Sequence, residues 1–124
     1  MAESGSVIGW LLVADQREKL LKQFPPNFEK TVAHHVTLQG EAKREPIPPE
    51  VQATIVGRTD DGEGVEAMVV AIDGTTDRPD GSTYHITWSL GPGRKARESK
   101  DVLRDQGWRP TVAPIPILLE PARF

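Results

Sequence analysis

The sequence predicts a small α+β domain in which antiparallel sheets form two lobes around a central cleft, with helices on the outside. The chain has 124 residues, which fits a single domain, 1–124, with a small core. Its β-rich runs are short, and 11 glycines and 11 prolines supply turns between them. Two segments of helical character each lie beside a β-rich run, so two similar βα units are expected.

The first third of the chain predicts a β-α-β unit. Ser6–Val13 is β-rich and is typical of a buried strand. Asp15 is the expected cap of a helix over Gln16–Phe24, which Pro25-Pro26 would end. Thr31–Gln39 predicts a second strand.

The middle of the chain predicts a hairpin between two loops. Gly40–Glu50 is polar and interrupted by prolines, so it is expected to be a loop. Val51–Asp60 and Val65–Asp73 are β-rich and flank a Gly-rich tetrapeptide, a hairpin pattern. The acidic turn Thr59–Glu66 is expected to be its solvated tip, because the ligand spacing of a calcium loop is absent. Gly74–Thr83 is the second loop.

The last third predicts a strand, a helix and a final strand. Tyr84–Leu90 is β-rich. A helix is expected from about Ser99, which would cap it, to Gly107, which would stop it. The tail, Thr111–Phe124, predicts one strand around Pro116–Glu120, and its prolines favour an edge position.

Composition restricts the function classes. The net charge is −3, so no strong overall field attracts nucleic acid and any anion binding must be local. The absence of cysteine excludes disulfides and thiolate metal sites and fits a reducing compartment. The longest apolar run, Val7–Ala14, is too short to cross a bilayer. We therefore expect a cytoplasmic protein without a membrane partner.

Two predicted strands carry the same short pattern. His34–Gln39 reads HHVTLQ and Tyr84–Leu90 reads YHITWSL, and the His-x-Thr pattern in each begins at His35 and at His85, two of the three histidines. Because side chains alternate along a strand, His35 shares a face with Thr37. By the same rule His85, Thr87 and Ser89 share a face. Each strand would then line a cleft with a polar face and pack its apolar face on the core.

A histidine and a threonine in this arrangement suit phosphate chemistry. Imidazole exchanges a proton near neutrality, and the threonine hydroxyl can donate a hydrogen bond to a phosphoryl oxygen. One neutral imidazole could deprotonate an attacking water while one imidazolium protonates the leaving oxygen. Such a reaction needs no metal and no cofactor.

The segments HVTL and HITW resemble the paired His-x-Thr signatures of the two-histidine (2H) phosphoesterase superfamily. The likeness is greatest to the cyclic phosphodiesterase domain of fungal-type tRNA ligases, and Arg94–Leu103 resembles the stretch that follows the second motif there. The resemblance implies a bilobal fold and hydrolysis of 2′,3′-cyclic phosphates on RNA ends or nucleotides, commonly to a 2′-phosphate. It also implies acid–base roles for the two motif histidines and phosphate binding by the two threonines. Carried over, these residues are His35, His85, Thr37 and Thr87.

The resemblance leaves several points open. We favour His35 as the acid and His85 as the base, although the sequence does not assign these roles. The histidines are 50 positions apart, closer than in many members of the superfamily, which leaves substrate recognition less defined than chemistry. An RNA ligase or kinase acting on the same ends is a candidate partner, and a monomer is expected.

Other residues have competing interpretations. Arg94 and Lys95, with Arg97, are candidates for contact with phosphate or an RNA end, but a solvated loop explains the same charges equally well. His34 falls on the face of the apolar strand positions and is interpreted as a structural histidine at the edge of the core. Zinc is a poor alternative, because adjacent histidines point to opposite faces of a strand. Trp10 and Trp88 are expected in the core, whereas Trp108 is left open between core packing and base stacking.

Two other functions remain compatible with the motifs. The domain could bind an RNA end or nucleotide without turnover, although a pure binding module does not need two proton carriers. Alternatively, a 2H enzyme could act on ADP-ribose 1″,2″-cyclic phosphate or on a linear 2′,5′-phosphodiester. The His/Thr quartet would look the same in these enzymes.

Overall fold

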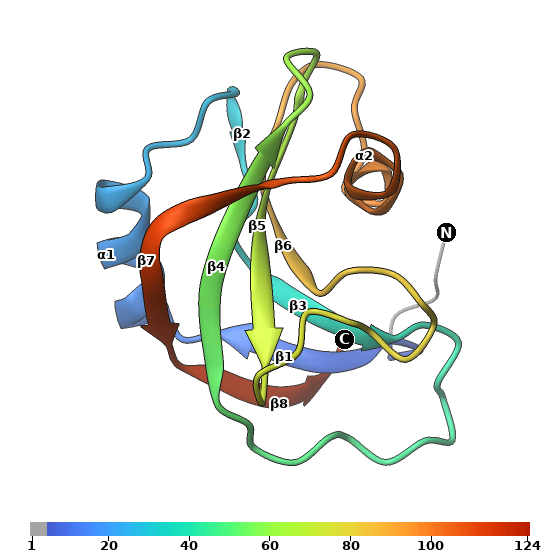
Figure 1. Cartoon of the computed structure of the whole chain (residues 1–124). Coiled ribbons are helices and arrows are strands. Elements are labelled where there is room, and N and C mark those ends of the chain that lie inside the picture. Colours follow the sequence, from blue (N-terminus) through green and yellow to red (C-terminus); the bar gives the residue numbers. More distant parts are fainter. Residues whose placement is uncertain (1–4) are drawn as a thin grey trace.

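A computed structural model describes residues 5–124, and it contains two antiparallel sheets and two helices (Figure 1). In chain order the elements are β1 (Ile8–Leu12), α1 (Ala14–Gln23), β2 (Lys30–Thr31), β3 (His35–Gln39), β4 (Ala53–Asp60), β5 (Val65–Ile72), β6 (His85–Leu90), α2 (Glu98–Gln106), β7 (Arg109–Ile117) and β8 (Leu119–Arg123). The predicted α+β class is confirmed. Among the described residues, no helix is long and apolar enough to cross a membrane.

The strands are divided between a three-stranded sheet of order β3-β1-β8 and a five-stranded sheet of order β2-β6-β5-β4-β7. The β4–β5 hairpin is confirmed as an antiparallel pair. The tail was expected to contain one edge strand, and it contains two. β7 forms an edge of the larger sheet and β8 an edge of the smaller one, positions that tolerate proline because one side of the strand makes no ladder bonds.

The larger sheet is covered on both faces. Leu20 of α1 packs in the main core with Trp88 of β6, whereas Val102 of α2 packs in a second cluster with Leu90. Figure 1 shows the two helices on opposite sides of the sheet. This explains why every residue of β5 is buried. Trp10 and Trp88 are fully buried, as predicted.

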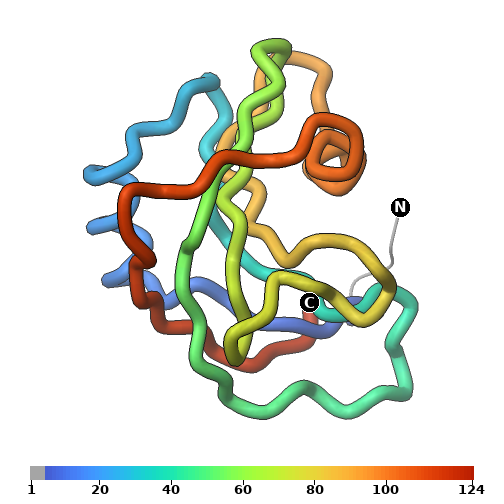
Figure 2. Tube along the Cα trace, viewed as in Figure 1, coloured from blue at the N-terminus to red at the C-terminus, as the bar shows by residue number. Residues whose placement is uncertain are grey.

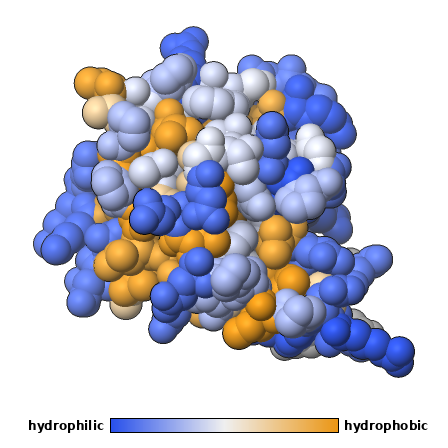
Figure 3. Space-filling view, turned by 60° about the horizontal axis from the view of Figure 1, so that its bottom comes forward, coloured by the Kyte–Doolittle hydropathy of each residue, from blue (hydrophilic) through white to orange (hydrophobic). Residues whose placement is uncertain are grey.

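The outer surface on the side of the three-stranded sheet is mixed. Hydrophobic patches lie beside hydrophilic side chains on the side of the molecule that is at the bottom of Figure 1 (Figure 3). Large apolar side chains that are exposed include Ile47 and Leu118. Ile47 lies in the proline-broken loop between β3 and β4, where the sequence predicts no regular element.

The segment Thr31–Gln39 is not one strand, as the sequence predicted, but two short strands that belong to different sheets. Ala33 has a positive φ of 45°, which breaks the extended backbone. The backbone N–H groups of Val32 and Ala33 donate to the carbonyls of Trp88 and Thr87 in β6, at 2.9 Å each. Past the break, β3 pairs with β1. The crossing, visible in the trace of Figure 2, carries the chain from beside β6 into the three-stranded sheet.

Both helices begin one or two residues earlier than expected. α1 follows Val13 and has no side-chain cap, so Asp15 is not the cap but lies in the first turn, where a carboxylate complements the helix dipole. α2 follows Arg97, and Ser99 is buried in its first turn instead of capping it. Gly107 ends α2 with a φ of 72°, as predicted.

The hairpin tip is less solvated than predicted. The Asp61 carboxylate accepts hydrogen bonds from the backbone N–H groups of Glu63 and Val65 and pairs with Arg94. Glu66 is fully buried. Its carboxylate is satisfied by the Ser89 hydroxyl, the Asn27 backbone N–H and the Arg58 guanidinium. A buried carboxylate needs such partners, and an alternation pattern does not reveal them.

Candidate functional site

The two His/Thr pairs line a single cavity of about 280 Å³, although they lie far apart in the sequence. One pair comes from β3 of the smaller sheet and the other from β6 of the larger sheet. The loop before β6 and the start of α2 complete the wall. The residues that line the cavity are His35, Thr37, Arg78, His85, Thr87, Ala96, Arg97 and Lys100.

Strand alternation places the first pair. Val36 is fully buried in the main core, so its neighbours His35 and Thr37 point to the other face of β3, as predicted. β3 is held close to β1, where Gly9 lies opposite Thr37. A Cβ atom at Gly9 would overlap the carbonyl oxygen of Val36, so this approach of the strands requires glycine.

Alternation also places the second pair, but it fails further along β6. Ile86 and Trp88 pack in the main core, whereas Thr87 turns towards α2. The β5–β6 ladder shifts register between Glu66 and Ala67. Beyond this bulge Ser89 bonds to Glu66, and Leu90 packs under α2. Ser89 was expected on the face of His85 and Thr87, and that prediction is wrong because a bulge reverses the facing of the residues that follow it.

His85 has one ring nitrogen committed to the backbone. Its Nδ1 atom lies 2.8 Å from the carbonyl oxygen of Thr83, and since a carbonyl only accepts, Nδ1 carries the proton in this contact. Nε2 of the neutral ring then keeps its lone pair. Burial lowers the pKa of His85 below its usual value, and the hydrogen bond to Thr83 opposes this only in part.

His35 is neutral near pH 7 in the free protein. Burial, followed by the charges of His34 and His85, lowers the pKa of His35 to about 4. Its Nδ1 atom lies 3.0 Å from Nδ1 of His34, and its ring stacks at an angle on Phe124, with 4.5 Å between ring centroids. His85 is close enough to affect the pKa of His35, and both rings line the same cavity.

His34 is exposed, which contradicts its interpretation as a histidine at the edge of the core. His34 lies outside β3, between its first residue and Ala33, whose positive φ breaks the extended backbone, so the alternation of β3 does not govern the side chain of His34. His34 instead contacts the ring of His35 from the solvent side.

The Thr87 hydroxyl is held by α2. Its Oγ1 atom lies 2.9 Å from Oγ of Ser99 and 3.3 Å from the carbonyl oxygen of Ala96. A hydroxyl has one proton and two lone pairs. If Ser99 donates to Thr87, the Thr87 proton is free to turn from Ala96 to an oxygen of a bound anion. Ser99, predicted as a helix cap, therefore positions a residue of the cavity wall.

The cavity is basic, but its cations are only partly those that the sequence suggests. Arg97 lines it, whereas Arg94 and Lys95 do not. Arg94 forms ion pairs with Asp61 at 2.9 Å and Glu98 at 3.0 Å. Direct contact of Arg94 and Lys95 with a substrate therefore stays a prediction, and neither residue lines the cavity.

Two further cations of the wall, Arg78 and Lys100, were missed by sequence reasoning. Lys100 lies three residues after Arg97, a spacing that brings side chains to one side of a helical turn, so this signal was available. Arg78 lies in the loop before β6, and nothing in its local sequence distinguishes it from a solvated loop residue.

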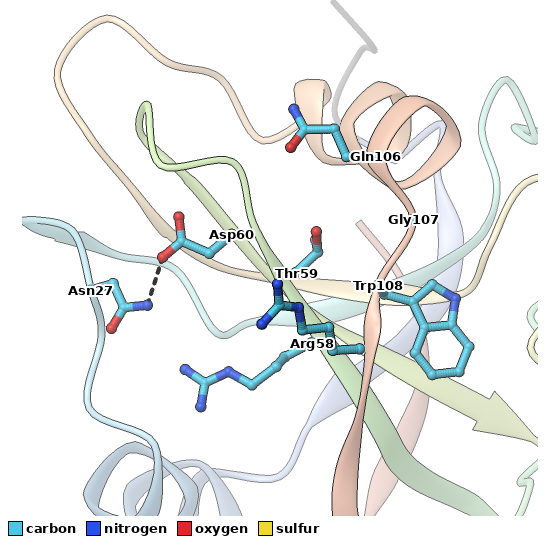
Figure 4. Close-up of a pocket in the computed structure, with 8 residues that line it drawn as sticks. Asn27, Arg58, Thr59, Asp60, Gln106, Gly107 and Trp108 are labelled. Carbon is cyan, nitrogen blue, oxygen red and sulfur yellow. Dashed lines mark hydrogen bonds between the residues drawn. The ribbon is translucent and has the colours of Figure 1, made fainter.

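A larger cavity of about 530 Å³ lies near β4 and β7 (Figure 4). Asn27 donates to Asp60 across it at 2.8 Å. Trp108, whose role the sequence left open, is 37% exposed, lines this cavity and packs on Gly57. No histidine lines it, so it lacks a side chain that titrates ordinarily near neutrality. The smaller cavity is therefore the better candidate for acid–base chemistry.

The described residues, 5–124, contain no group of three or more histidine and carboxylate side chains arranged to hold a metal ion. The chain matches no protein-family model, no curated protein and no solved structure.

Proposed function

We propose that the protein is a metal-independent 2′,3′-cyclic phosphodiesterase that opens the cyclic phosphate of RNA ends or nucleotides. The observation that carries the proposal is the convergence of His35, Thr37, His85 and Thr87 on one cavity. Two proton carriers and two hydroxyl donors around one cavity suit the metal-independent hydrolysis of a phosphodiester. On this proposal the two sheets correspond to the two lobes of a 2H-like fold.

The proposed reaction has one displacement step. A neutral histidine removes a proton from water as the water oxygen bonds to phosphorus. The bond from phosphorus to the ribose 3′-oxygen breaks, and the protonated histidine donates its proton to that oxygen. The product is a 2′-phosphate with a free 3′-hydroxyl, and the two histidines have exchanged protonation states. Thr37 and Thr87 donate hydrogen bonds to the non-bridging oxygens.

The hydrogen bonds of the rings support the assignment of His85 as base. Its Nδ1–H is held by Thr83, so the Nε2 lone pair is the one available to accept a proton. His35 is the proposed acid. Its imidazolium is disfavoured in the free protein, but a bound phosphate anion stabilises it.

The proposal is tested with a short RNA oligonucleotide that ends in a 2′,3′-cyclic phosphate. The expected products carry a 2′-phosphate, identified by mass spectrometry and by resistance of the end to an enzyme that removes only 3′-phosphates. The rate should be unchanged in EDTA. Binding of the oligonucleotide without turnover would instead indicate a binding module, and loss of activity on chelation would contradict the mechanism.

A further inference from the structure

The cavity has more positive charge than the proposed reaction needs. Arg78, Arg97 and Lys100 line it and contribute three positive charges, while burial lowers the pKa of both histidines and so disfavours their charged forms. Asp80 balances one of these charges, because its carboxylate contacts Arg78 at 2.7 Å and Lys100 at 3.4 Å. Two positive charges remain. A cyclic phosphodiester carries only one negative charge, so the site can hold a second anionic group.

Arg78 is the most distinctive of these cations. Its side chain is only 12% exposed, although it is a charged residue on a surface loop. Its Nε atom is buried and is the one buried side-chain nitrogen or oxygen in the described part of the chain that has no hydrogen-bond partner. A buried donor without a partner costs stability, and an acceptor on a ligand would remove that cost. The charge of Arg78 also acts on His85, which places the guanidinium within electrostatic reach of the reacting centre.

A neighbouring hollow of about 230 Å³ lies between α2 and the loop before β6, and Lys100 lines it as well as the cavity. Arg104 lies one turn further along α2 and lines the same hollow, but its guanidinium pairs with Asp101 and Asp105. The cations available to a second anionic group are therefore those of the cavity wall itself, in a protein whose net charge is −3.

We propose that Arg78 and Lys100 form a subsite for a second phosphate, attached on the 5′ side of the nucleotide whose cyclic phosphate reacts. This inference rests on the proposed function and defines its substrate class. The preferred substrate has a phosphate at the 5′ position, either the phosphodiester of an RNA strand or a terminal 5′-phosphate. In the free protein the Asp80 carboxylate contacts both cations of this subsite.

The test compares three substrates that differ only on the 5′ side: 2′,3′-cyclic AMP with a free 5′-hydroxyl, the same nucleotide with a 5′-phosphate, and an adenosine dinucleotide ending in the cyclic phosphate. We expect kcat/KM to be at least about tenfold higher for one or both substrates with the second phosphate, mainly through KM, for a contact of this charge-assisted kind. A gain with the dinucleotide alone identifies the strand phosphodiester, and a gain with the 5′-phosphate alone identifies a terminal phosphate. Equal kcat/KM values for all three substrates would overturn the inference.

Two variants assign the preference to the subsite. In Arg78→Gln and in Lys100→Gln the ratio of kcat/KM values should fall towards one, whereas Lys22→Gln, the same charge change on the exposed face of α1, should leave the ratio unchanged. The ratio is insensitive to a loss of folded protein, and Lys100 is 49% exposed, so its variant is expected to fold. A ratio that stays at the wild-type value in Lys100→Gln and in Arg78→Gln would overturn the assignment.

A binding measurement separates this inference from the proposed function. Adenosine 2′-phosphate and adenosine 2′,5′-bisphosphate are titrated calorimetrically into the wild type and Lys100→Gln. Tighter binding of the bisphosphate by the wild type, lost in the variant, supports the subsite even if the protein turns over no cyclic substrate. Absence of turnover would contradict the proposed function but not the subsite. Turnover without any preference for the second phosphate, in kinetics and in binding, overturns the subsite and leaves the proposed function intact.

Discussion

The hydroxyl oxygens of Thr87 and Ser99 lie 2.9 Å apart, and both residues are buried. Thr87 belongs to β6 and Ser99 to the first turn of α2. The contact therefore connects the helix that brings cations to the cavity with the strand that supplies one His/Thr pair. When Ser99 is the donor, the single proton of Thr87 is left for the Ala96 carbonyl or for a bound anion.

Replacing Ser99 with alanine should weaken the site without removing a residue from its wall. The Thr87 hydroxyl would keep only the Ala96 carbonyl as partner, so its proton would point away from a bound phosphate. We expect kcat/KM to fall about tenfold and the free energy of unfolding to fall by about 1 kcal/mol, the worth of one buried hydrogen bond. Steady-state kinetics and urea unfolding measure the two effects. Thr87→Ser, which keeps the hydroxyl, is the matched control, and full activity of Ser99→Ala would contradict this role.

Loss of either cavity histidine should abolish most of the activity. His35→Gln and His85→Gln each remove one proton carrier, and each should lower kcat about 10²- to 10⁴-fold on the cyclic substrate. His34→Gln is the natural control, because it removes the adjacent but exposed ring. That variant should retain activity within about tenfold. Rapid-quench measurements of product formation distinguish a slow chemical step from weak binding, and a fully active His85→Gln enzyme would exclude the proposed mechanism.

The dependence of kcat/KM on pH follows from the two lowered pKa values. The reaction needs one histidine protonated and the other neutral, and the pKa of His35 is about 4 while that of His85 lies below its usual value. The profile should therefore be bell-shaped with its maximum below pH 6.5, and it should fall about tenfold per pH unit on the alkaline side. The kcat profile should be displaced to higher pH, because bound phosphate stabilises the imidazolium. A kcat/KM maximum above pH 7.5 would be incompatible with these pKa values.

Folding stability should decrease in acid for the same reason. The unfolded chain binds a proton at His35 below about pH 6.5, whereas the folded protein resists that proton until about pH 4. Stability is then complete above the unfolded pKa and is lost as the pH falls from about 6.5 to about 4. A difference of about 2.5 pKa units corresponds to up to about 3 kcal/mol. Urea unfolding at pH 7 and pH 4 should show this loss, and it should be smaller in His35→Gln. Equal acid sensitivity in that variant would show that His35 is not the source.

Strand periodicity was sufficient to predict which residues of β3 and β6 turn away from the core. Val36, Ile86 and Trp88 are buried as the alternation requires, and their histidine and threonine neighbours line the cavity. Periodicity failed where the backbone departs from regular pairing, at the positive φ of Ala33 and at the bulge beside Glu66. Those departures determine the exposure of His34 and the environment of Ser89, and no local sequence pattern marks them.

The cationic part of the wall was harder to predict, because it depends on which loops and helices pack beside the strands. Arg94 and Arg97 are three residues apart in the same basic cluster, but only Arg97 reaches the cavity. Arg94 is drawn to the hairpin tip by the buried carboxylate of Asp61. Arg78 joins the wall because the loop that carries it folds against α2, where Asp80 contacts Lys100. Such long-range pairings are set by tertiary structure and are not encoded in the spacing of charges.

The approach of β1 to β3 provides a way to displace the first His/Thr pair without touching it. A methyl group at Gly9 would overlap the Val36 carbonyl oxygen, and because that obstacle is backbone it cannot move aside as a side chain could. Gly9→Ala should therefore push β3 away from β1 and lower the free energy of unfolding by about 1–3 kcal/mol, as overpacked sites do. It should also lower kcat/KM at pH 7 by more than the loss of folded protein explains. Activity per folded molecule, obtained from kinetics and from the unfolding curve of the same sample, is the measurement. Gly40→Ala is the matched control, since a Cβ atom there meets nothing within 4 Å and the residue is exposed. If the folded fraction of Gly9→Ala is as active as that of Gly40→Ala, the position of β3 does not control the site.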